Sequence, residues 1–263
     1  MTTLVHISDI HFGDASPDKL RAASVALSRI GPACVIVTGD VTQAGKRGEF
    51  ALAAAWFKTI KAPIVGCPGN HDTPMFNLAL RLLDPFSRFD RLGLLSSWQS
   101  ADASVHIEAA NSARGLQWRM DWSQGDYAQP NVIEALGRLR TSRARHKILA
   151  LHHPPKTPTG GGVTSEPKGV DVFARHLTET KPDVLLCGHL HAAFDITGPL
   201  MCGLRVMTVP SLASSRERGF GSGFGVLRLR SNDSKITRTI WRYREGSFNE
   251  VTEPSKGTLD VAG

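Results

Sequence analysis

The chain has 263 residues, of which 41% are hydrophobic and 21% charged, and its formal net charge at pH 7 is +7. This length allows one large domain or two small ones, and the composition excludes a globally disordered chain. No apolar run approaches the roughly 20 residues that span a bilayer, so we expect no membrane partner.

The start of the chain and its cysteines indicate where the protein resides. Thr2 and Thr3 lead directly into an apolar run typical of a buried strand, not of a signal peptide, so we expect a mature chain that starts at or near Met1. The positive charge favours anionic partners, either phosphate compounds or nucleic acid. Scattered cysteines without a C-x-x-C pair are typical of reduced, packed thiols and indicate a cytoplasmic protein. The cysteines are Cys34, Cys67, Cys187 and Cys202.

The first third of the chain alternates between strand and helix patterns. The first helix has Ser16 as its cap, Pro17 at its first position and Gly31 as its stop. The β-α-β-α-β order predicts a mainly parallel sheet flanked by helices. We predict strands over residues 4–8, 34–38 and 63–66, and a second helix over residues 48–60.

The remainder of the chain is less regular, and its C-terminal part has a β-rich pattern. We predict one or two helices over residues 75–97, a helix over 131–140, a short helix around Arg175, and strands over 104–109, 146–151 and 184–187. Turn residues at Gly198-Pro199, at Gly203 and over 231–233 divide the β-rich run of residues 193–243. We expect a single domain over residues 1–247 and a polar C-terminal tail over 248–263.

Five short motifs follow predicted strands, where ligands gather in open α/β sheets. Asp9 and His11 alternate along a segment that we expect to be extended, so both side chains could hold one ion, although an Asp that caps a strand is commoner. Gly39 allows the backbone to turn sharply before Asp40. The two carboxylate oxygens of Asp40 could bridge two cations, although Gly-Asp is also a common turn.

The third motif, Gly69-Asn70-His71-Asp72, places four chemically useful groups in sequence. Asn70 supplies a neutral carbonyl oxygen, and His71 can act as an acid or donate a hydrogen bond to phosphate. Asp72 could orient His71 through the other ring nitrogen. A simple turn is the alternative explanation of this motif.

The last two motifs contribute imidazoles. His152 and His153 precede two prolines at the end of an apolar strand, and a sheet fixes the position of such a pair. His189 and His191 follow another strand, where Gly188 permits a close approach of the backbone. Together the motifs combine nitrogen with hard oxygen donors and no thiolate, which suits Mn, Fe, Zn or Co but not a structural zinc finger.

The order of these motifs, D-x-H, G-D, G-N-H-D, H-H-P-P and G-H-x-H, resembles that of the calcineurin-like metallophosphoesterases, and it extends from Asp9 to His191. The resemblance implies an α/β fold, a four-layer α/β/β/α sandwich of two mixed sheets flanked by helices. Within the family, Gly39-Asp40-Val41-Thr42 and the H-H-P-P motif resemble the class III cyclic nucleotide phosphodiesterase and glycerophosphodiesterase branch.

The resemblance also implies roles for individual residues. One metal ion would be held by Asp9, His11, Asp40 and His191. The other would be held by Asp40, Asn70, His152 and His189. His71 and Asp72 would be catalytic, and the substrate contacts would come from Asn70, His71, His153 and Asn111.

The implied reaction is hydrolysis of a small phosphodiester, of cyclic nucleotide or glycerophosphodiester type, by a metal-bridging hydroxide. A phosphomonoesterase, a nucleotide pyrophosphatase and a non-catalytic scaffold stay open as alternatives, as does a homo-oligomer. A nuclease or nucleic-acid-binding protein is also open, with the basic run at residues 138–147 as its surface, although a solvated helix end explains that run as well. We expect the loops 111–118, 154–168 and 211–223 to select the substrate, with Arg114, Arg216 and Arg218 as candidate contacts.

Overall fold

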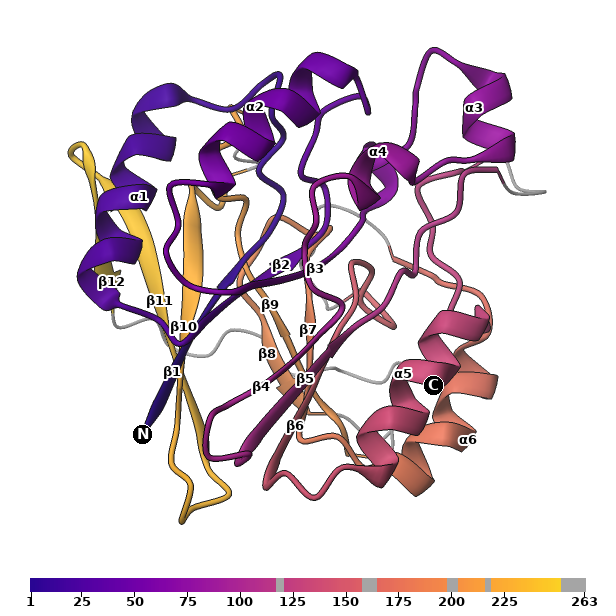
Figure 1. Cartoon of the computed structure of the whole chain (residues 1–263), viewed down its shortest axis with the longest axis vertical. Coiled ribbons are helices and arrows are strands. Elements are labelled where there is room, and N and C mark those ends of the chain that lie inside the picture. The colour runs from indigo at the N-terminus through magenta and orange to yellow at the C-terminus, as the bar shows by residue number, and fades with distance from the viewer. Residues whose placement is uncertain (117–120, 158–164, 198–202, 216–218, 252–263) are drawn as a thin grey trace.

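The computed structural model describes residues 1–116, 121–157, 165–197, 203–215 and 219–251, and in it two sheets pack face to face (Figure 1). Each sheet has six strands. The first has the order β12 (Ser247–Val251), β11 (Ile236–Arg244), β10 (Gly223–Leu229), β1 (Thr2–Ile7), β2 (Cys34–Thr38), β3 (Ile64–Cys67). The second has the order β4 (Ser97–Gln99), β5 (Val105–Ala109), β6 (His146–Ala150), β7 (Val184–Cys187), β9 (Arg205–Thr208), β8 (Asp195–Thr197).

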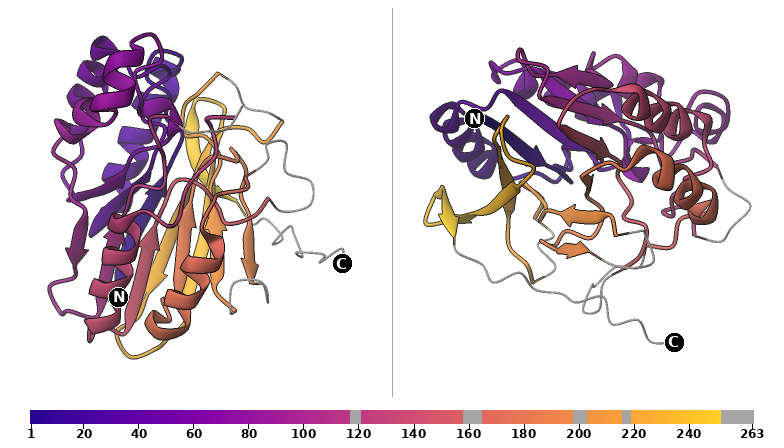
Figure 2. Two further views of the ribbon diagram at one scale, coloured as in Figure 1. Left: turned by 90° about the vertical axis from the view of Figure 1, so that its right-hand side faces the viewer. Right: turned by 90° about the horizontal axis from the view of Figure 1, so that it is seen from below.

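Helices cover the outer faces of both sheets, as the two views of Figure 2 show. α1 (Pro17–Ile30) and α2 (Arg47–Phe57) pack on the first sheet, and α5 (Pro130–Thr141) and α6 (Val170–Thr180) pack on the second. Three short helices, η1 (Asn70–Asp72), α3 (Leu78–Leu83) and α4 (Ser87–Asp90), follow β3. The predicted four-layer sandwich of two mixed sheets flanked by helices is confirmed.

The apolar strands are buried on both faces because each sheet lies between a helix layer and the other sheet. Along β1, Val5 and Ile7 face the helices, whereas Leu4 faces the second sheet, and all three side chains are fully buried. Continuous apolar runs are typical of such doubly covered strands. Burial of this kind stabilises a fold by about 25 cal/mol per Å² of apolar surface.

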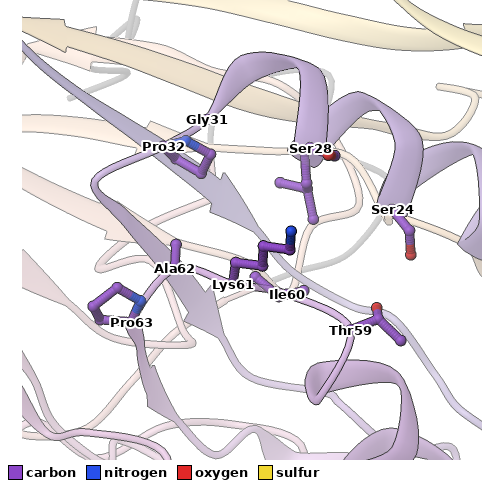
Figure 3. A pocket seen from close by; sticks show the side chains of 10 residues that line it. Ser24, Ser28, Gly31, Pro32, Thr59, Ile60, Lys61, Ala62 and Pro63 are labelled. Atoms are coloured by element: carbon purple, nitrogen blue, oxygen red, sulfur yellow. The ribbon is translucent and has the colours of Figure 1, made fainter.

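The first helix begins and ends where the sequence predicts. Pro17 occupies its first position, and Gly31 follows its end with φ of 59°, a left-handed conformation that glycine adopts without strain. The backbone N–H of Gly31 donates to the carbonyl of Leu27 at 3.0 Å. A hollow of about 370 Å³ lies beside this helix end, at the amino ends of β2 and β3 (Figure 3), and none of the motif residues line it.

The end of the chain departs from the prediction. The expected tail starts at residue 248, but Phe248 belongs to β12 and is 1% exposed, with its ring 5.1 Å from that of Phe224. The strand was missed because three of its five residues, Ser247, Asn249 and Glu250, are exposed polar residues of an edge strand. The fold therefore continues to Val251. The predicted turn at Gly198-Pro199 lies outside the described residues.

Parallel pairing aligns the carboxyl ends of the strands within each sheet, and contacts between the sheets, such as that of His152 Nδ1 with the carbonyl of Thr38, bring the two aligned edges together. β1, β2 and β3 pair in parallel in the first sheet, and β6 and β7 do so in the second. We call the loops that follow these strands the rim; they comprise residues 8–12, 39–42, 68–73, 151–155 and 188–191. All five motifs lie on the rim. Among the described residues, the helices lack the length and apolar composition needed to cross a membrane.

Candidate metal centre

The rim has an unusual backbone. Eight of the described non-glycine residues have positive φ, and five of these are candidate ligands: Asp9 (52°), His11 (56°), Asp40 (48°), His189 (68°) and His191 (56°). The left-handed conformation costs roughly 1–2 kcal/mol per non-glycine residue, and such residues cluster at functional sites. The expectation of an extended Asp9–His11 segment is therefore wrong. Both residues are turned inward, and their loop is tied to the next by hydrogen bonds from Asp9 N to Gly39 O and from His11 N to Asp40 O, each 3.0 Å.

Glycines allow the rim loops to approach one another. A Cβ atom on Gly39 would lie 2.6 Å from Nδ1 of His152. One on Gly188 would lie 2.7 Å from Oδ2 of Asp9 and closer still to Oγ of Ser8. Any larger residue would push a candidate ligand out of place, so the close approach predicted for Gly188 is confirmed, and Gly39 approaches its neighbours as closely.

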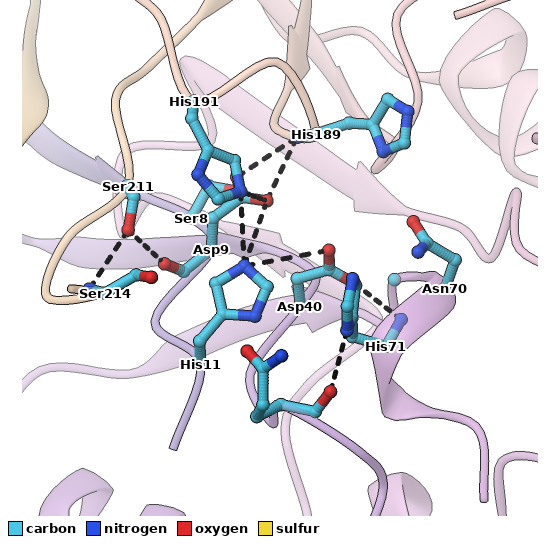
Figure 4. Close-up of polar contacts among 12 residues, drawn as sticks. Ser8, Asp9, His11, Asp40, Asn70, His71, His189, His191, Ser211 and Ser214 are labelled. Carbon is cyan, nitrogen blue, oxygen red and sulfur yellow. Dashed lines mark hydrogen bonds and ion pairs between the residues drawn. The ribbon is translucent and has the colours of Figure 1, made fainter. Parts of the chain in front are cut away.

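On one side of the centre, two imidazoles converge on Asp9 (Figure 4). Nε2 of His191 lies 3.3 Å from Asp9 Oδ1, and Nε2 of His11 lies 3.9 Å from the same oxygen. The two Nε2 atoms are 3.2 Å apart. All three side chains are buried, so their ligand atoms face one small enclosed volume.

On the other side, Asp40 is shared. Nε2 of His152 lies 3.3 Å and Nε2 of His11 4.0 Å from one oxygen, Asp40 Oδ2. The side-chain oxygen of Asn70 lies 3.2 Å from His152 Nε2. The second oxygen of Asp40 accepts a hydrogen bond from the backbone N–H of His71 at 2.8 Å. Asp40 therefore turns one oxygen toward imidazoles from both sides of the centre.

His189 joins this second side. Its backbone N–H donates to the Asp9 carboxylate at 3.0 Å, and its ring lies 5.2 Å from that of His152 in an edge-on arrangement. Nitrogens of these two rings and of His153 lie within 4.8 Å of one another. The structure thus brings the seven candidate ligands together on the rim, and their role as metal ligands stays a prediction.

The pKa values of the ionisable groups indicate that the centre lacks positive charge to balance its carboxylates. Burial alone would raise the pKa of Asp40, but the imidazoles of His152 and His71 hold it well below its usual range. Burial alone would lower the pKa of His152, but the Asp40 carboxylate raises it to about 9. For His11 burial prevails and lowers the pKa to about 4, so its imidazole is neutral at neutral pH.

These residues fit divalent cations. The buried carboxylates of Asp9 and Asp40 and the converging Nε2 atoms form a donor set of nitrogen and oxygen without sulfur. The side-chain carbonyl of Asn70 adds a neutral oxygen. The same atoms would be costly to bury without a cation, because two carboxylates repel each other in a low dielectric.

His71 stands beside the cluster with one nitrogen engaged. Its Nδ1 lies 2.7 Å from the carbonyl of Gln43; a carbonyl only accepts, so Nδ1 carries the proton. The ring meets that of His11 edge-on at 4.9 Å and is partly exposed. Nε2 of His71 is therefore the nitrogen that remains for a substrate.

Asp72 does not orient His71, which corrects the prediction. Its carboxylate is fully buried and accepts hydrogen bonds from Thr42 N (2.8 Å), Thr42 Oγ1 (2.9 Å) and Gly69 N (2.9 Å). Burial, and then the charge of Asp40, raises the pKa of Asp72 to about 6. Asp72 therefore ties two rim loops together. The hydrogen bonds of its carboxylate do not involve the side chain of His71, although the two residues are adjacent in sequence.

Two residues that we predicted to contact the substrate have side chains that are engaged elsewhere. His153 is fully buried, and its ring nitrogens are taken by Ser112 Oγ (2.9 Å) and the carbonyl of Ser123 (2.7 Å). The side chain of Asn111 accepts from Ala113 N at 2.7 Å, and the residue lines a separate hollow of about 520 Å³ that contains none of the predicted ligands. The roles of these residues were predicted from their positions along the chain, and a position in the sequence does not show the direction in which a side chain points.

The structure adds positioning contacts that the sequence did not indicate. The carbonyl of Thr38 accepts from His152 Nδ1 at 2.7 Å and from Ser8 Oγ at 2.9 Å, so Nε2 of His152 faces the centre. Ser211 Oγ donates to the carbonyl of Asp9 at 2.6 Å. A backbone carbonyl is present at every residue, so no residue type marks these positions.

The candidate anion contacts are largely engaged. Arg114 pairs with Asp126 at 2.6 Å, while Arg216 and Arg218 lie outside the described residues. In the basic run, Arg138 pairs with the buried Glu108 at 2.8 Å and Arg140 with Glu179 at 2.9 Å. These ion pairs reduce the charge that the run offers to nucleic acid.

Comparison with known proteins agrees with this geometry. The model of a family described as calcineurin-like phosphoesterase matches residues 2–193. The chain is 23% identical over 248 residues to a probable cyclic nucleotide phosphodiesterase of Vesicomyosocius okutanii, a match that covers 91% of this chain and 98% of the relative. It is 24% identical over 183 residues to the 3',5'-cyclic adenosine monophosphate phosphodiesterase CpdA of Escherichia coli K12, a match that covers 67% of this chain and 60% of the relative.

Solved structures show the same fold at low identity. A purple acid phosphatase from yellow lupin has a TM-score of 0.60 at 13% identity, over 95% of this chain and 52% of that one. A 5'-nucleotidase from Candida albicans has a TM-score of 0.58 at 11% identity, over 94% of this chain and 52% of that one. The chain thus spans about half the length of these two enzymes.

Proposed function

The chain belongs to the calcineurin-like phosphoesterase family and is a phosphoric ester hydrolase, and we propose that it hydrolyses phosphodiesters with two metal ions held on the rim. The observation that carries this proposal is the position of Asp40, whose Oδ2 lies within 4.0 Å of Nε2 of both His152 and His11. A carboxylate between imidazoles from two sides is the arrangement that two adjacent cations need.

Each cation would have its own set of ligands. Asp9, His11, Asp40 and His191 would hold the first. Asp40, Asn70, His152 and His189 would hold the second. When bound, two such cations acidify a water molecule and neutralise the charge of the phosphate. The donor set suits Mn, Fe, Zn or Co.

The chain's own residues prepare the ligands and serve the leaving group. The carbonyl of Thr38 fixes His152 so that its Nε2 faces the cation, and binding requires that nitrogen to release its proton. The carbonyl of Gln43 fixes His71 with Nε2 toward the substrate. A protonated His71 can donate to a phosphate oxygen or give its proton to the departing alkoxide.

The preference for diesters rests on the relatives. The match that extends over 98% of the relative is to a protein named as a probable cyclic nucleotide phosphodiesterase. The CpdA protein is named for the same bond, the cyclic diester of adenosine monophosphate. These names support a small phosphodiester as the substrate, and the proposal keeps both the cyclic nucleotide and the glycerophosphodiester type.

A substrate comparison tests the proposal. Protein loaded with Mn²⁺ should hydrolyse bis-p-nitrophenyl phosphate at a higher kcat/KM than p-nitrophenyl phosphate. A cyclic nucleotide and a glycerophosphodiester, compared next, separate the two diester types. Faster turnover of the monoester would contradict the diesterase assignment. A protein that binds no Mn²⁺ and hydrolyses neither compound would contradict the metal centre itself.

A further inference from the structure

His153 follows the candidate ligand His152, yet its own nitrogens are engaged inside the protein. Nε2 lies 2.7 Å from the carbonyl of Ser123, so Nε2 carries the proton, because a carbonyl only accepts. Nδ1 then accepts from Ser112 Oγ at 2.9 Å. These two bonds fix both the tautomer and the orientation of a side chain that has no exposed surface.

The ring of His153 forms a common support for two candidate ligands. Its centroid lies 4.7 Å from that of His152, at an interplanar angle of 83°, and 4.9 Å from that of His189, at 54°. The rings of His152 and His189 are themselves 5.2 Å apart. Three rings thus pack on one another, and two of them belong to the ligand set of the second cation.

On its other side, His153 has no space to withdraw. A Cβ atom added to Gly125 would lie 2.7 Å from Cγ and Nδ1 of its ring. Tyr127, which is fully buried, donates its hydroxyl to the carbonyl of His153 at 2.5 Å. The segment that carries Gly125 is tied to Lys168 by the bond from Lys168 N to Gly125 O at 3.0 Å. The loop that carries Gly125 therefore packs against the ring of His153 on the side away from His152 and His189, and its bond to Lys168 fixes that loop.

We propose that His153 is a positioning residue for the second metal ion: it holds the rings of His152 and His189 in the orientation that binds the cation. The proposal rests on the two-metal centre proposed above. An imidazole binds a cation only along the lone pair of its nitrogen, so a ring that can rotate loses affinity. The packed ring of His153 restricts that rotation for two ligands at once. His153 has no comparable contact with the ligands of the first cation, since its ring contacts are to His152 and His189.

Two variants disturb the support in different ways. His153→Phe keeps a ring but removes both of its hydrogen bonds. Gly125→Ala leaves His153 unchanged and pushes on its ring; Gly125 does not have a positive φ, so alanine is compatible with its backbone. His146→Phe is the matched control, because His146 is a fully buried histidine at the start of β6, the strand that leads to His153, and its Nε2 donates to the carbonyl of Arg230, away from the rim.

The measurement is binding of Mn²⁺ to the metal-free protein, by titration calorimetry and by metal analysis after dialysis at fixed free Mn²⁺. Wild-type protein should bind two ions per chain. In both variants one of the two ions should lose about 10- to 100-fold in affinity, the usual effect of removing a group that orients a ligand, and the other ion should bind as before. His146→Phe should bind both ions as wild type does, even if its unfolding midpoint falls.

Each other outcome has a distinct meaning. Two ions bound with wild-type affinities in both variants would overturn the positioning role. So would a loss confined to His153→Phe with Gly125→Ala unchanged, because that pattern is expected if His153 is itself a ligand. A wild-type protein that binds no Mn²⁺ would instead overturn the metal centre, and the positioning role with it.

Discussion

The strands of the two sheets and the rim that follows them have opposite chemistry within a few residues. Ile36 and Leu186 are extended, apolar and fully buried between the sheets. A few residues later along the same segments, Asp40 and His189 are buried as well, but they are ionisable and have left-handed backbones. The sheets bury apolar surface, which stabilises the fold, whereas the rim buries charge and strained backbone, which costs free energy.

This difference indicates that the sheets provide stability and the rim provides the ligands for metal binding. The sheets fix the ends of five strands, and the rim uses that rigidity to hold carboxylates and imidazoles that would separate in a flexible loop. A cation would offset the cost of burying Asp9 and Asp40 together. Substitutions in the two regions should therefore separate stability from metal binding.

The largest effect is expected on the rim, from Asp40→Asn. Because this removes the charge shared by both cations, activity should fall on the order of 10³-fold, the upper range for loss of one electrostatic contact in an active site. The stabilisation of the wild type by Mn²⁺, about 2.7 kcal/mol per site at 100 times Kd, should vanish as well. Turnover assays and urea unfolding with and without Mn²⁺ measure both. A variant that keeps two bound ions would break the proposed sharing.

Leu186→Ala tests the sheets, where we expect a loss of stability without a loss of metal binding. Leu186 is fully buried between the sheets, so its truncation should reduce the free energy of unfolding by about 3 kcal/mol through lost burial and a cavity. Its affinity for Mn²⁺ in the folded protein should match that of the wild type. If metal affinity fell together with stability, the two regions would not be separable.

His71→Ala sharpens the comparison within the rim. His71 would act on the substrate and is not among the proposed ligands, so we expect a loss of about 100-fold in kcat, the lower range for a lost acid catalyst. Metal content per chain should stay at the wild-type value. Metal analysis of the purified variant decides the matter, since a metal-free His71→Ala protein would show that the residue is a ligand.

The smallest effect is a pH dependence of stability at the border of the two regions. His6 on β1 donates to or accepts from Thr38 Oγ1 at 2.8 Å, and burial, then the charge of Arg238, lowers its pKa to about 3. The unfolded chain binds this proton below pH 6.5, so His6 contributes stability above that pH and loses it as the pH falls toward 3.

Between pH 7 and pH 5 the wild type should lose about 2 kcal/mol more unfolding free energy than His6→Gln, which has no proton to gain. Urea unfolding of both metal-free proteins at a series of pH values measures the difference. Parallel pH profiles for the two proteins would contradict the buried, neutral state of His6.

The sheets and the ligand set could be predicted because both depend on simple patterns. The apolar run Cys34–Thr38 is a strand with the predicted bounds, since a doubly covered strand tolerates few polar residues. Asp40 and His152 follow strands of different sheets, and their convergence was predicted from the order of the motifs, which resembles that of the family, and not from strand pairing.

The rest depends on three-dimensional detail that residue types do not encode. The left-handed backbones of Asp9 and His11 arise from the pairing of their loop with Gly39 and Asp40, a contact between loops that no local pattern predicts. Asp72 was assigned to His71 because the two are adjacent in sequence, but its carboxylate instead accepts from N–H groups of the loop that follows β2. The orientation of a side chain is decided by such distant partners.

The central claim, two cations around one carboxylate, is tested most directly by anomalous scattering from crystals of the Mn²⁺-loaded protein. We predict two peaks per chain roughly 3.5–4 Å apart, with a carboxylate oxygen of Asp40 between them. One peak should lie among Asp9, His11 and His191, and the other among Asn70, His152 and His189. A single peak, or peaks away from Asp40, would contradict the two-metal centre.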